Sequence, residues 1–213
     1  MLEEFNRPLT EAERRLVRGW TAFRRRQIDA MPKRTLCSAL VVIGALWLAT
    51  ILASNANRVV ISAFWLLFGI AMWLWVYTEE RRKLSRQIRT YESAIRRNEA
   101  TVVRVVASAV VELEEYEDEG LCHAFQIDED SIAFTTGQDY YDCSSRRFPN
   151  SDFSIINILD EGGEVAHIVM AKHGRKLEPV RKIPADVKLK LRQPGDLEVI
   201  SGRLADLERL LAQ

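Results

Sequence analysis

Two uncharged apolar runs placed close together constrain the fold of this chain more than any other feature of the sequence. Residues 35–53 read TLCSALVVIGALWLATILA and residues 59–77 read VVISAFWLLFGIAMWLWVY, with no charged side chain in either run. Each run is close to the ~20 residues that a helix needs to cross the bilayer core. We therefore predict a membrane α-hairpin of two transmembrane helices over residues 35–77, in preference to a pair of helices buried in a soluble core.

The Lys and Arg residues around the two runs predict the orientation of the hairpin. Nine precede the first run, seven lie in residues 79–97, and only Arg58 lies in the connection 54–58. Because Lys and Arg are enriched on the cytoplasmic side of membrane proteins, we expect a multi-pass protein with both termini in the cytoplasm. A cleaved signal peptide is disfavoured, since the first run begins far from Met1 and a second run follows at once.

Aromatic and small side chains within the two runs fit this arrangement. Trp73, Trp75 and Tyr77 gather at one end of the second run, as the aromatic belt at a membrane interface does. Gly44 and Gly69 are small residues of the kind that let two membrane helices approach closely. We expect the two helices to lie close together near these glycines.

The segments on either side of the hairpin, residues 1–34 and 78–98, are predicted to be cytoplasmic helical arms. In the first arm, residues 10–31 have an amphipathic basic pattern that begins with a capping box of Thr10 and Glu13. Proline lacks a backbone N–H and clashes with the preceding turn, so Pro32 predicts a break or kink at the membrane surface.

Apolar rows on the two arms predict that the arms pack against each other as one antiparallel stalk. The rows repeat at the 4-3-4 spacing of a coiled-coil seam. They consist of Leu16, Trp20, Phe23 and Gln27 on the first arm and Ile95, Tyr91, Ile88 and Leu84 on the second. The alternative is that the first arm lies flat on anionic lipid, with Trp20 and Phe23 immersed.

Formal charge divides the chain into two parts of opposite sign. Residues 1–98 carry 17 Lys and Arg against 8 Asp and Glu, a net charge of +9, and residues 99–213 carry 13 against 22, a net charge of −9. A basic anchor with an acidic tail is typical of a protein whose anchor meets anionic lipid. The acidic balance of residues 99–213 argues against nucleic acid as a partner, because phosphate contact needs clustered Lys and Arg.

Alternating and Val-rich segments predict that residues 99–213 form one soluble acidic β-rich domain. Glu161, Gly162 and Gly163 mark a hairpin turn between two such segments, and residues 204–211 have the spacing of a short helix. Few crossover helices are expected, so the pattern indicates a small, mostly antiparallel α+β domain, as a barrel or a sandwich. The predicted strands are 101–113, bent near Ala107 and Ser108, then 121–127, 131–136, 152–159, 164–170 and 196–200.

Candidate metal sites are sparse in this domain. The acidic run 112–120 lacks the ligand order of a calcium loop, and a solvated loop is the favoured interpretation. Structural zinc sites use close pairs of ligands, which Cys122 with His123, His167 and His173 do not supply. On its predicted strand His167 alternates with Val165 and Val169, which predicts that it packs on the core. We expect no metal and no cofactor.

Two catalytic arrangements are weighed against ordinary structure. A Cys–His dyad built from Cys122 or Cys143 with a histidine needs spatial adjacency that the sequence does not indicate. Residues 137–153 form the longest irregular stretch and carry aromatic, Arg and amide side chains that suit a recognition surface. An ordinary packed loop is favoured there, and no catalytic residue is assigned. The cysteines Cys37, Cys122 and Cys143 are expected to be reduced thiols.

Several short landmarks resemble a group of uncharacterised bacterial membrane proteins. They are EDEG at 117–120, GQ at 137–138, FPNSDF at 148–153, LEP at 177–179 and LADL at 204–207. Proteins of this group pair N-terminal spans with a small tail domain. The resemblance covers about the last 95 residues, and it implies a bacterial inner membrane without implying an activity.

The expected function is that of a membrane-tethered, non-enzymatic binding or assembly module. Its expected partners are the lipid bilayer and a protein, which is either another protein or a second copy of this chain. The alternatives are a membrane-anchored hydrolase that uses residues 137–153 and an oligomeric membrane effector or channel. The absence of charged residues from both apolar runs argues against a polar ion path through them.

Overall fold

The chain forms two compact units, and its first residues belong to the second of them. A computed structural model describes residues 1–53, 58–140 and 148–212. One unit is Thr10–Arg97, and the other combines Met1–Leu9 with Asn98–Gln213. Residues 1–9, which the sequence analysis placed in a helical arm, therefore fold with the C-terminal part of the chain.

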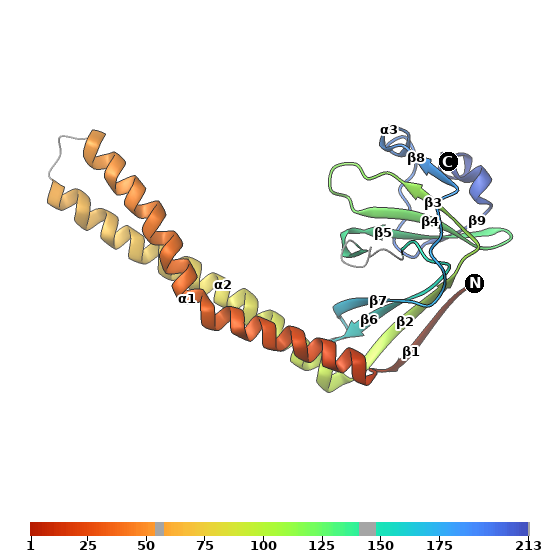
Figure 1. The fold of residues 1–213 in the computed structure, drawn as a ribbon, viewed down its shortest axis with the longest axis horizontal. Coiled ribbons are helices and arrows are strands. Elements are labelled where there is room, and N and C mark those ends of the chain that lie inside the picture. Colours follow the sequence, from red (N-terminus) through yellow and green to blue (C-terminus); the bar gives the residue numbers. More distant parts are fainter. Residues whose placement is uncertain (54–57, 141–147, 213) are drawn as a thin grey trace. The chain divides into compact units, whose positions relative to one another are not determined.

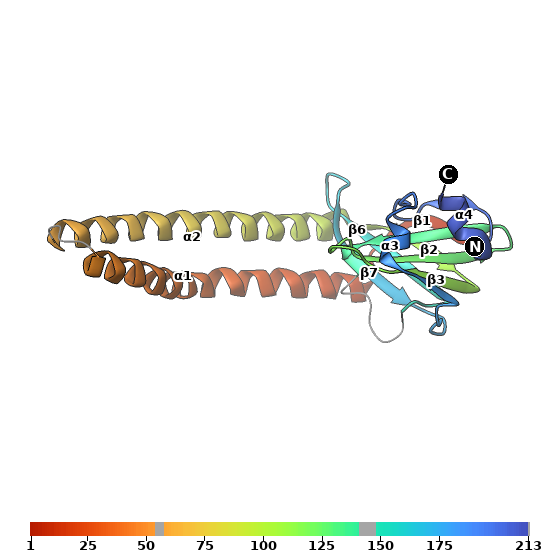
Figure 2. The same cartoon turned by 90° about the horizontal axis from the view of Figure 1, so that it is seen from above.

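The first unit consists of two long helices, α1 (Glu11–Ala53) and α2 (Arg58–Arg97), which lie side by side (Figures 1 and 2). The predicted capping box is present before α1: the Thr10 N–H donates to Glu13 Oε2 at 2.8 Å, and the Glu13 N–H donates to Thr10 Oγ1 at 3.3 Å. These bonds satisfy backbone donors that have no partner within the helix. The connection 54–57 lies outside the described residues.

Helix α1 does not end at Pro32. The helix continues through this residue to Ala53, so Pro32 does not break it, and a kink at this residue, the other form of the expectation, stays a prediction. Beside the proline, the Thr35 hydroxyl donates to the Met31 carbonyl oxygen at 2.9 Å. Packing against a second helix supports a backbone that has lost one hydrogen bond, and this is how helices in such pairs tolerate proline.

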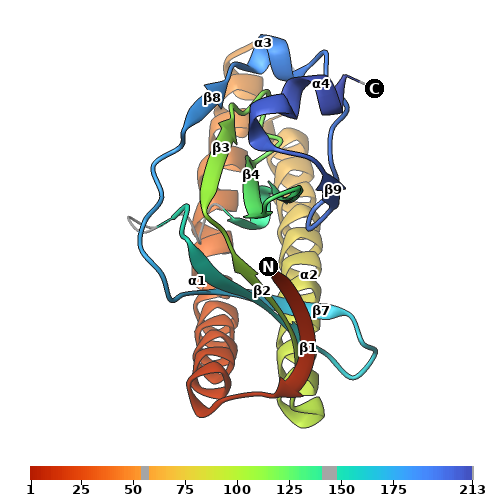
Figure 3. The same cartoon turned by 90° about the vertical axis from the view of Figure 1, so that its right-hand side faces the viewer.

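A strand that the sequence analysis missed precedes α1. Residues Leu2–Pro8 form β1, which pairs with β2 (Glu99–Val106) in antiparallel register from Leu2↔Val105 to Pro8↔Glu99 (Figures 1 and 3). The Met1 ammonium group extends the pairing by donating to the Val106 carbonyl oxygen at 2.9 Å. Both helices therefore lie, in sequence, between two neighbouring strands of one sheet.

The second unit contains two sheets, in agreement with the predicted antiparallel α+β domain. The first sheet has the order β1-β2-β6-β7, and the second has the order β8-β3-β4-β5-β9. Every pairing is antiparallel except that of β3 with β8. The remaining strands are β3 (Ala109–Leu113), β4 (Leu121–Asp128), β5 (Ser131–Gly137), β6 (Asp152–Leu159), β7 (Val165–Lys172), β8 (Arg181–Ile183) and β9 (Val199–Ser201).

The bend predicted near Ala107 and Ser108 is the point where the chain passes from one sheet to the other. Strand β2 ends at Val106 and β3 begins at Ala109 in the second sheet. A single Val-rich segment thus supplies strands to both sheets. Their facing side chains include Val105 and Phe153 from the first sheet and Phe125 from the second, and these share one core cluster.

The other face of the second sheet is covered by the C-terminal segment (Figure 3). A second core cluster joins Ile132 and Phe134 of β5 to Leu204, Leu207 and Leu211. The predicted C-terminal helix is present as η2 (Leu204–Asp206) followed by α4 (Leu207–Leu211). Two short helices complete the unit, η1 (Gln138–Tyr140) and α3 (Ala185–Lys188).

Candidate functional site

The largest unexplained surface of the described chain is the apolar exterior of the two helices. Among the described residues, the helix Val59–Arg97 is long and apolar enough to cross a membrane, with a mean hydropathy of 2.2 in its most apolar window. None of that window is buried. In α1 the described apolar stretch is shorter, Leu40–Leu52. A continuous apolar surface of this kind needs a partner other than water.

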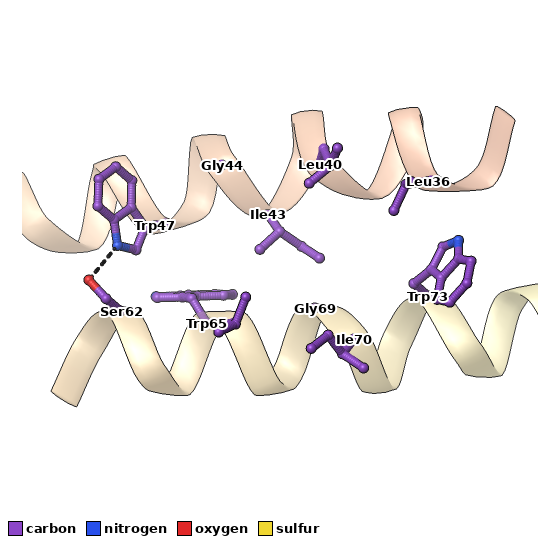
Figure 4. Close-up of a pocket in the computed structure, with 11 residues that line it drawn as sticks. Leu36, Leu40, Ile43, Gly44, Trp47, Ser62, Trp65, Gly69, Ile70 and Trp73 are labelled. Atoms are coloured by element: carbon purple, nitrogen blue, oxygen red, sulfur yellow. Dashed lines mark hydrogen bonds between the residues drawn. The ribbon is translucent and has the colours of Figure 1, made fainter. Parts of the chain in front are cut away.

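The two helices are in close contact where α2 carries a glycine. A Cβ atom placed on Gly69 would lie 2.7 Å from Ile43 Cδ1, so a side chain at this position would require the Ile43 side chain to move. An apolar groove of about 320 Å³ lies beside the contact (Figure 4). In the same groove the Trp47 indole N–H donates to Ser62 Oγ at 3.0 Å, which joins the two helices by a polar contact.

A larger cavity of about 760 Å³ lies between the same helices and has a polar end and an apolar end. We call it the amphipathic cavity. Arg24, Gln27 and Glu80 line its polar end. Its apolar side chains include Val42, Leu46, Phe68 and Met72.

Arg24 is the residue in the amphipathic cavity whose bonding is incomplete. Its Nη1 donates to Gln27 Oε1 at 2.9 Å, while its Nε is buried and has no partner among the described residues. Glu80, by contrast, is paired with Lys83 at 3.3 Å. This site was not predicted from the sequence. The available signal was the row of Arg24, Gln27 and Met31 on one face of α1.

The face of α1 that the sequence analysis assigned to a stalk seam is exposed. Trp20 and Phe23 are 38% and 48% exposed, whereas Val17 and Thr21, one position further along the helix, are buried. The most buried side chains of this part of α1 are therefore not the predicted aromatic ones, and the pairing of Trp20 and Phe23 with the second arm stays a prediction. The arms do lie side by side, and Arg25 Nη2 lies 2.5 Å from Glu92 Oε1.

His123 is the most perturbed titratable group in the second unit. It is 4% exposed and contacts the rings of Phe125 and Phe148, with ring centroids 5.9 and 5.2 Å away. Burial lowers the pKa of His123 to about 4, so the imidazole is neutral at pH 7. Within the described residues its Nδ1 has no hydrogen-bond partner, and neither has the hydroxyl of Thr135, which lies opposite His123 on β5.

The sequence candidates for a zinc site or a Cys–His dyad lie apart. Cys122 packs in the core cluster on one face of β4, and the neighbouring His123 contacts aromatic rings of the other cluster. Burial raises the pKa of the Cys122 thiol, which makes it a poor nucleophile. His173 Nε2 lies 3.2 Å from Ser154 Oγ. Within residues 1–53, 58–140 and 148–212, no three His, Cys, Asp or Glu side chains are grouped as metal ligands.

His167 does not pack on the core as its alternation with Val165 and Val169 predicted. Ile168 and Met170 of β7 pack on the core cluster between the sheets, and successive strand residues point to opposite faces. The half-buried His167 therefore lies on the opposite face. Cys143 and the side chain of Cys37 lie outside the described part of the chain.

The acidic run 112–120 is in part a set of contacts within the domain. Glu112 accepts a hydrogen bond from Lys182 Nζ at 2.9 Å, and Glu119 accepts one from the buried Lys188 Nζ at 2.5 Å. Glu114, Glu117 and Asp118 are exposed, as the prediction of a solvated loop requires. The run therefore attaches to the C-terminal segment at both ends and is exposed between them.

The described parts of the irregular stretch 137–153 hold the fold together. The Tyr140 hydroxyl donates to Asp196 Oδ2 at 2.7 Å, and the fully buried Asn150 accepts the N–H groups of Asp152 and Gly174, each at 3.0 Å. Asn150 Nδ2 also donates to the Gly174 carbonyl oxygen at 3.1 Å. The FPNSDF segment thus contains a structural clamp. Residues 141–147 lie outside the described part of the chain.

No family model, no curated protein and no solved structure matches this chain. A proposal for its function therefore rests on the geometry and the charge of its own residues. The region that most clearly calls for a binding partner is the helical unit, because its apolar exterior is exposed and the amphipathic cavity lies between its helices.

Proposed function

We propose that the chain is a membrane-tethered, non-enzymatic binding or assembly module. In this proposal α1 and α2 cross a bilayer as a two-span hairpin, and the two-sheet unit lies on the cytoplasmic side. The landmarks shared with bacterial membrane proteins favour the inner membrane as its location. The two-sheet unit would bind a protein partner, or a second copy of this chain.

The pairing of β1 with β2 is the observation that carries the proposal. Pro8 and Glu99 are partners in one sheet, and the whole helical unit lies between them in sequence. Residues on both sides of the helices are therefore on the same side of any membrane. A chain that leaves and returns to one side crosses an even number of times, so if α2 spans the bilayer, α1 must span it as well.

The distribution of charge supports the orientation. Arg81, Arg82 and Lys83 follow the apolar part of α2, and the corresponding part of α1 is preceded by Arg24, Arg25 and Arg26. Basic residues on both outer flanks favour placing these flanks in the cytoplasm.

The interior of the two-sheet unit supports binding in preference to catalysis. Several of its buried polar groups serve the fold: Asn150 binds backbone groups, Tyr140 binds Asp196, and Lys188 binds Glu119. Cys122, one of the two cysteines weighed for a Cys–His dyad, points to the opposite face of β4 from the neighbouring His123. A partner would accordingly be recognised by the exterior of the unit.

Cysteine labelling in intact cells tests the proposal. In a variant whose three native cysteines are replaced by alanine, a cysteine at Asn55 should react with a membrane-impermeant maleimide added outside. A cysteine at Gln213 should react only after the membrane is permeabilised. Labelling of position 213 from outside would show that the orientation is the opposite of the proposed one. Recovery of the chain in the soluble fraction would contradict the proposal that it is a membrane protein.

A further inference from the structure

We propose that the amphipathic cavity between α1 and α2 binds one anionic phospholipid. The headgroup phosphate would lie at Arg24 and Gln27, and an acyl chain would lie along Val42, Leu46, Phe68 and Met72. This inference rests on the proposed function, because it requires the helices to lie in a bilayer. Beyond the membrane anchoring in the proposed function, it assigns a site that binds one particular class of lipid.

The length of the cavity accommodates a whole phospholipid. On α2 its lining runs from Leu84 to Phe68, and on α1 it runs from Arg24 to Leu46. These 16 and 22 residue steps correspond to roughly 24 and 33 Å of helix, at about 1.5 Å per residue. Half of a bilayer, with its headgroup region included, is about 20–22 Å thick. The cavity is therefore long enough to hold the headgroup together with an acyl chain.

Charge at the polar end selects the headgroup. Arg24 forms no ion pair with any carboxylate in the described chain, and its guanidinium is held by the amide oxygen of Gln27. The carboxylate of Glu80 already has a cation, Lys83. The polar end therefore carries one positive charge without a counter-charge. Arg pairs strongly with phosphate oxygens, and in a partly buried site this pairing is stronger than in water.

The position of Trp73 is consistent with a lipid in this place. Its indole N–H donates to Thr35 Oγ1 at 3.1 Å, and its ring stacks on Tyr77 with centroids 5.6 Å apart. Trp and Tyr occupy the interfacial level of membranes. Because Trp73 also lines the amphipathic cavity, the cavity passes from the interface into the hydrocarbon at this residue.

Native mass spectrometry of the full chain in a mild non-ionic detergent tests the site. Delipidated protein is mixed with equal amounts of phosphatidylglycerol and phosphatidylcholine, and the lipid that stays bound is weighed. We expect one phosphatidylglycerol per chain, retained about tenfold more than phosphatidylcholine. Arg24→Gln should abolish this preference. Arg26→Gln, which removes the same charge from an exposed residue outside the cavity, should leave it unchanged.

A second variant tests the apolar end. Val42→Trp fills the cavity with an apolar ring, and it should reduce retention of both lipids at least tenfold while the helical content stays that of the wild type. Equal losses for Arg24→Gln and Arg26→Gln would overturn the headgroup assignment. If the wild-type chain sits in membranes with the proposed topology but retains no lipid, the cavity inference fails and the membrane anchor stands. If labelling shows no membrane insertion, both fail.

Discussion

Lys188 Nζ lies 2.5 Å from Glu119 Oε2, although the lysine is only 3% exposed. Gln193 donates a second hydrogen bond to the same carboxylate at 3.2 Å. The hydrogen bond from Lys188 lowers the pKa of Glu119, which is therefore ionised at neutral pH. This pair ties the end of the acidic run to α3, where a buried ammonium group requires an anion.

Replacing Lys188 with methionine should lower the free energy of unfolding by about 1–3 kcal/mol, the usual contribution of a hydrogen bond to a charged group. Methionine retains much of the apolar chain, so the loss reports the charge. Lys190→Met changes an exposed lysine nearby and should have little effect. Denaturant unfolding of the full chain in detergent at pH 7.5 measures both variants, and equal losses would contradict the prediction.

The same pair should make stability depend on acid. Because the folded pKa of Glu119 lies below its usual value of 4.5, its contribution is complete above that pH. It is lost as the pH falls through the lower, folded pKa. Between pH 5 and pH 3 the wild type should therefore lose more stability than Lys188→Met. Parallel pH profiles for the two proteins would show that the pair does not act in this way.

His123 should give a separate pH dependence at higher pH. Its pKa is about 4 in the folded chain and about 6.5 when unfolded, so the unfolded state binds the proton first. Stability is complete above pH 6.5 and should fall by about 2 kcal/mol by pH 5, above the range where Glu119 titrates.

His123→Leu should remove most of that loss. It should also preserve stability at pH 7.5, because it replaces a buried imidazole whose Nδ1 has no partner. Unfolding curves at pH 7.5 and pH 5 for the wild type and the variant provide the measurement. If the variant loses as much unfolding free energy between pH 7.5 and pH 5 as the wild type does, the pH dependence arises from another group.

Gly69 and Gly44 provide a matched pair for helix packing. A side chain on Gly69 would overlap Ile43, whereas nothing lies within 4 Å of a Cβ atom on Gly44. Gly69→Leu should therefore destabilise the helical pair by about 1–3 kcal/mol, as overpacking does, and Gly44→Leu should cost much less. Thermal unfolding in detergent compares the two variants, and a greater loss for Gly44→Leu would exclude this packing.

Val17 and Trp20 test which face of α1 is buried. Val17→Ala should lower the unfolding free energy by about 1–2 kcal/mol, since Val17 is fully buried. Trp20→Ala removes a much larger side chain, and in detergent it should cost less free energy than Val17→Ala per unit of side-chain area removed, because Trp20 is 38% exposed. A greater cost per unit area for Trp20→Ala would support the seam that the sequence predicted.

Local pattern was sufficient to predict most of the strands. Alternation and turn residues predicted β4 to β7 within a few residues, and the Ala107–Ser108 break separated β2 from β3. Strand β1 was missed because the segment LEEFNRP has no alternation of its own. It is a strand because β2, far along the chain, supplies its hydrogen-bonding partners. Such tertiary pairing overrides local propensity.

The helical arms show a similar limit. Large aromatic residues were assigned to the seam, yet α1 buries the smaller Val17 and Thr21 and exposes Trp20. A shift of one residue turns a helix face by 100°, so an apolar row alone fixes the face poorly. The amphipathic cavity was not predictable for the same reason. Arg24 lines a cavity because Glu80 and Phe68 lie on the facing helix, and the sequence does not show which faces of the two helices meet.

The pairing of β1 with β2 also determines when this protein can fold. Strand β1 is synthesised before β2, its neighbour in the sheet among the described strands, and residues 10–97 are synthesised between the two. At about 5–20 residues per second, the delay is on the order of 10 s. During that interval the backbone N–H and C=O groups of β1 lack their partners on β2. The two strands can pair only after the second helix and β2 have left the ribosome.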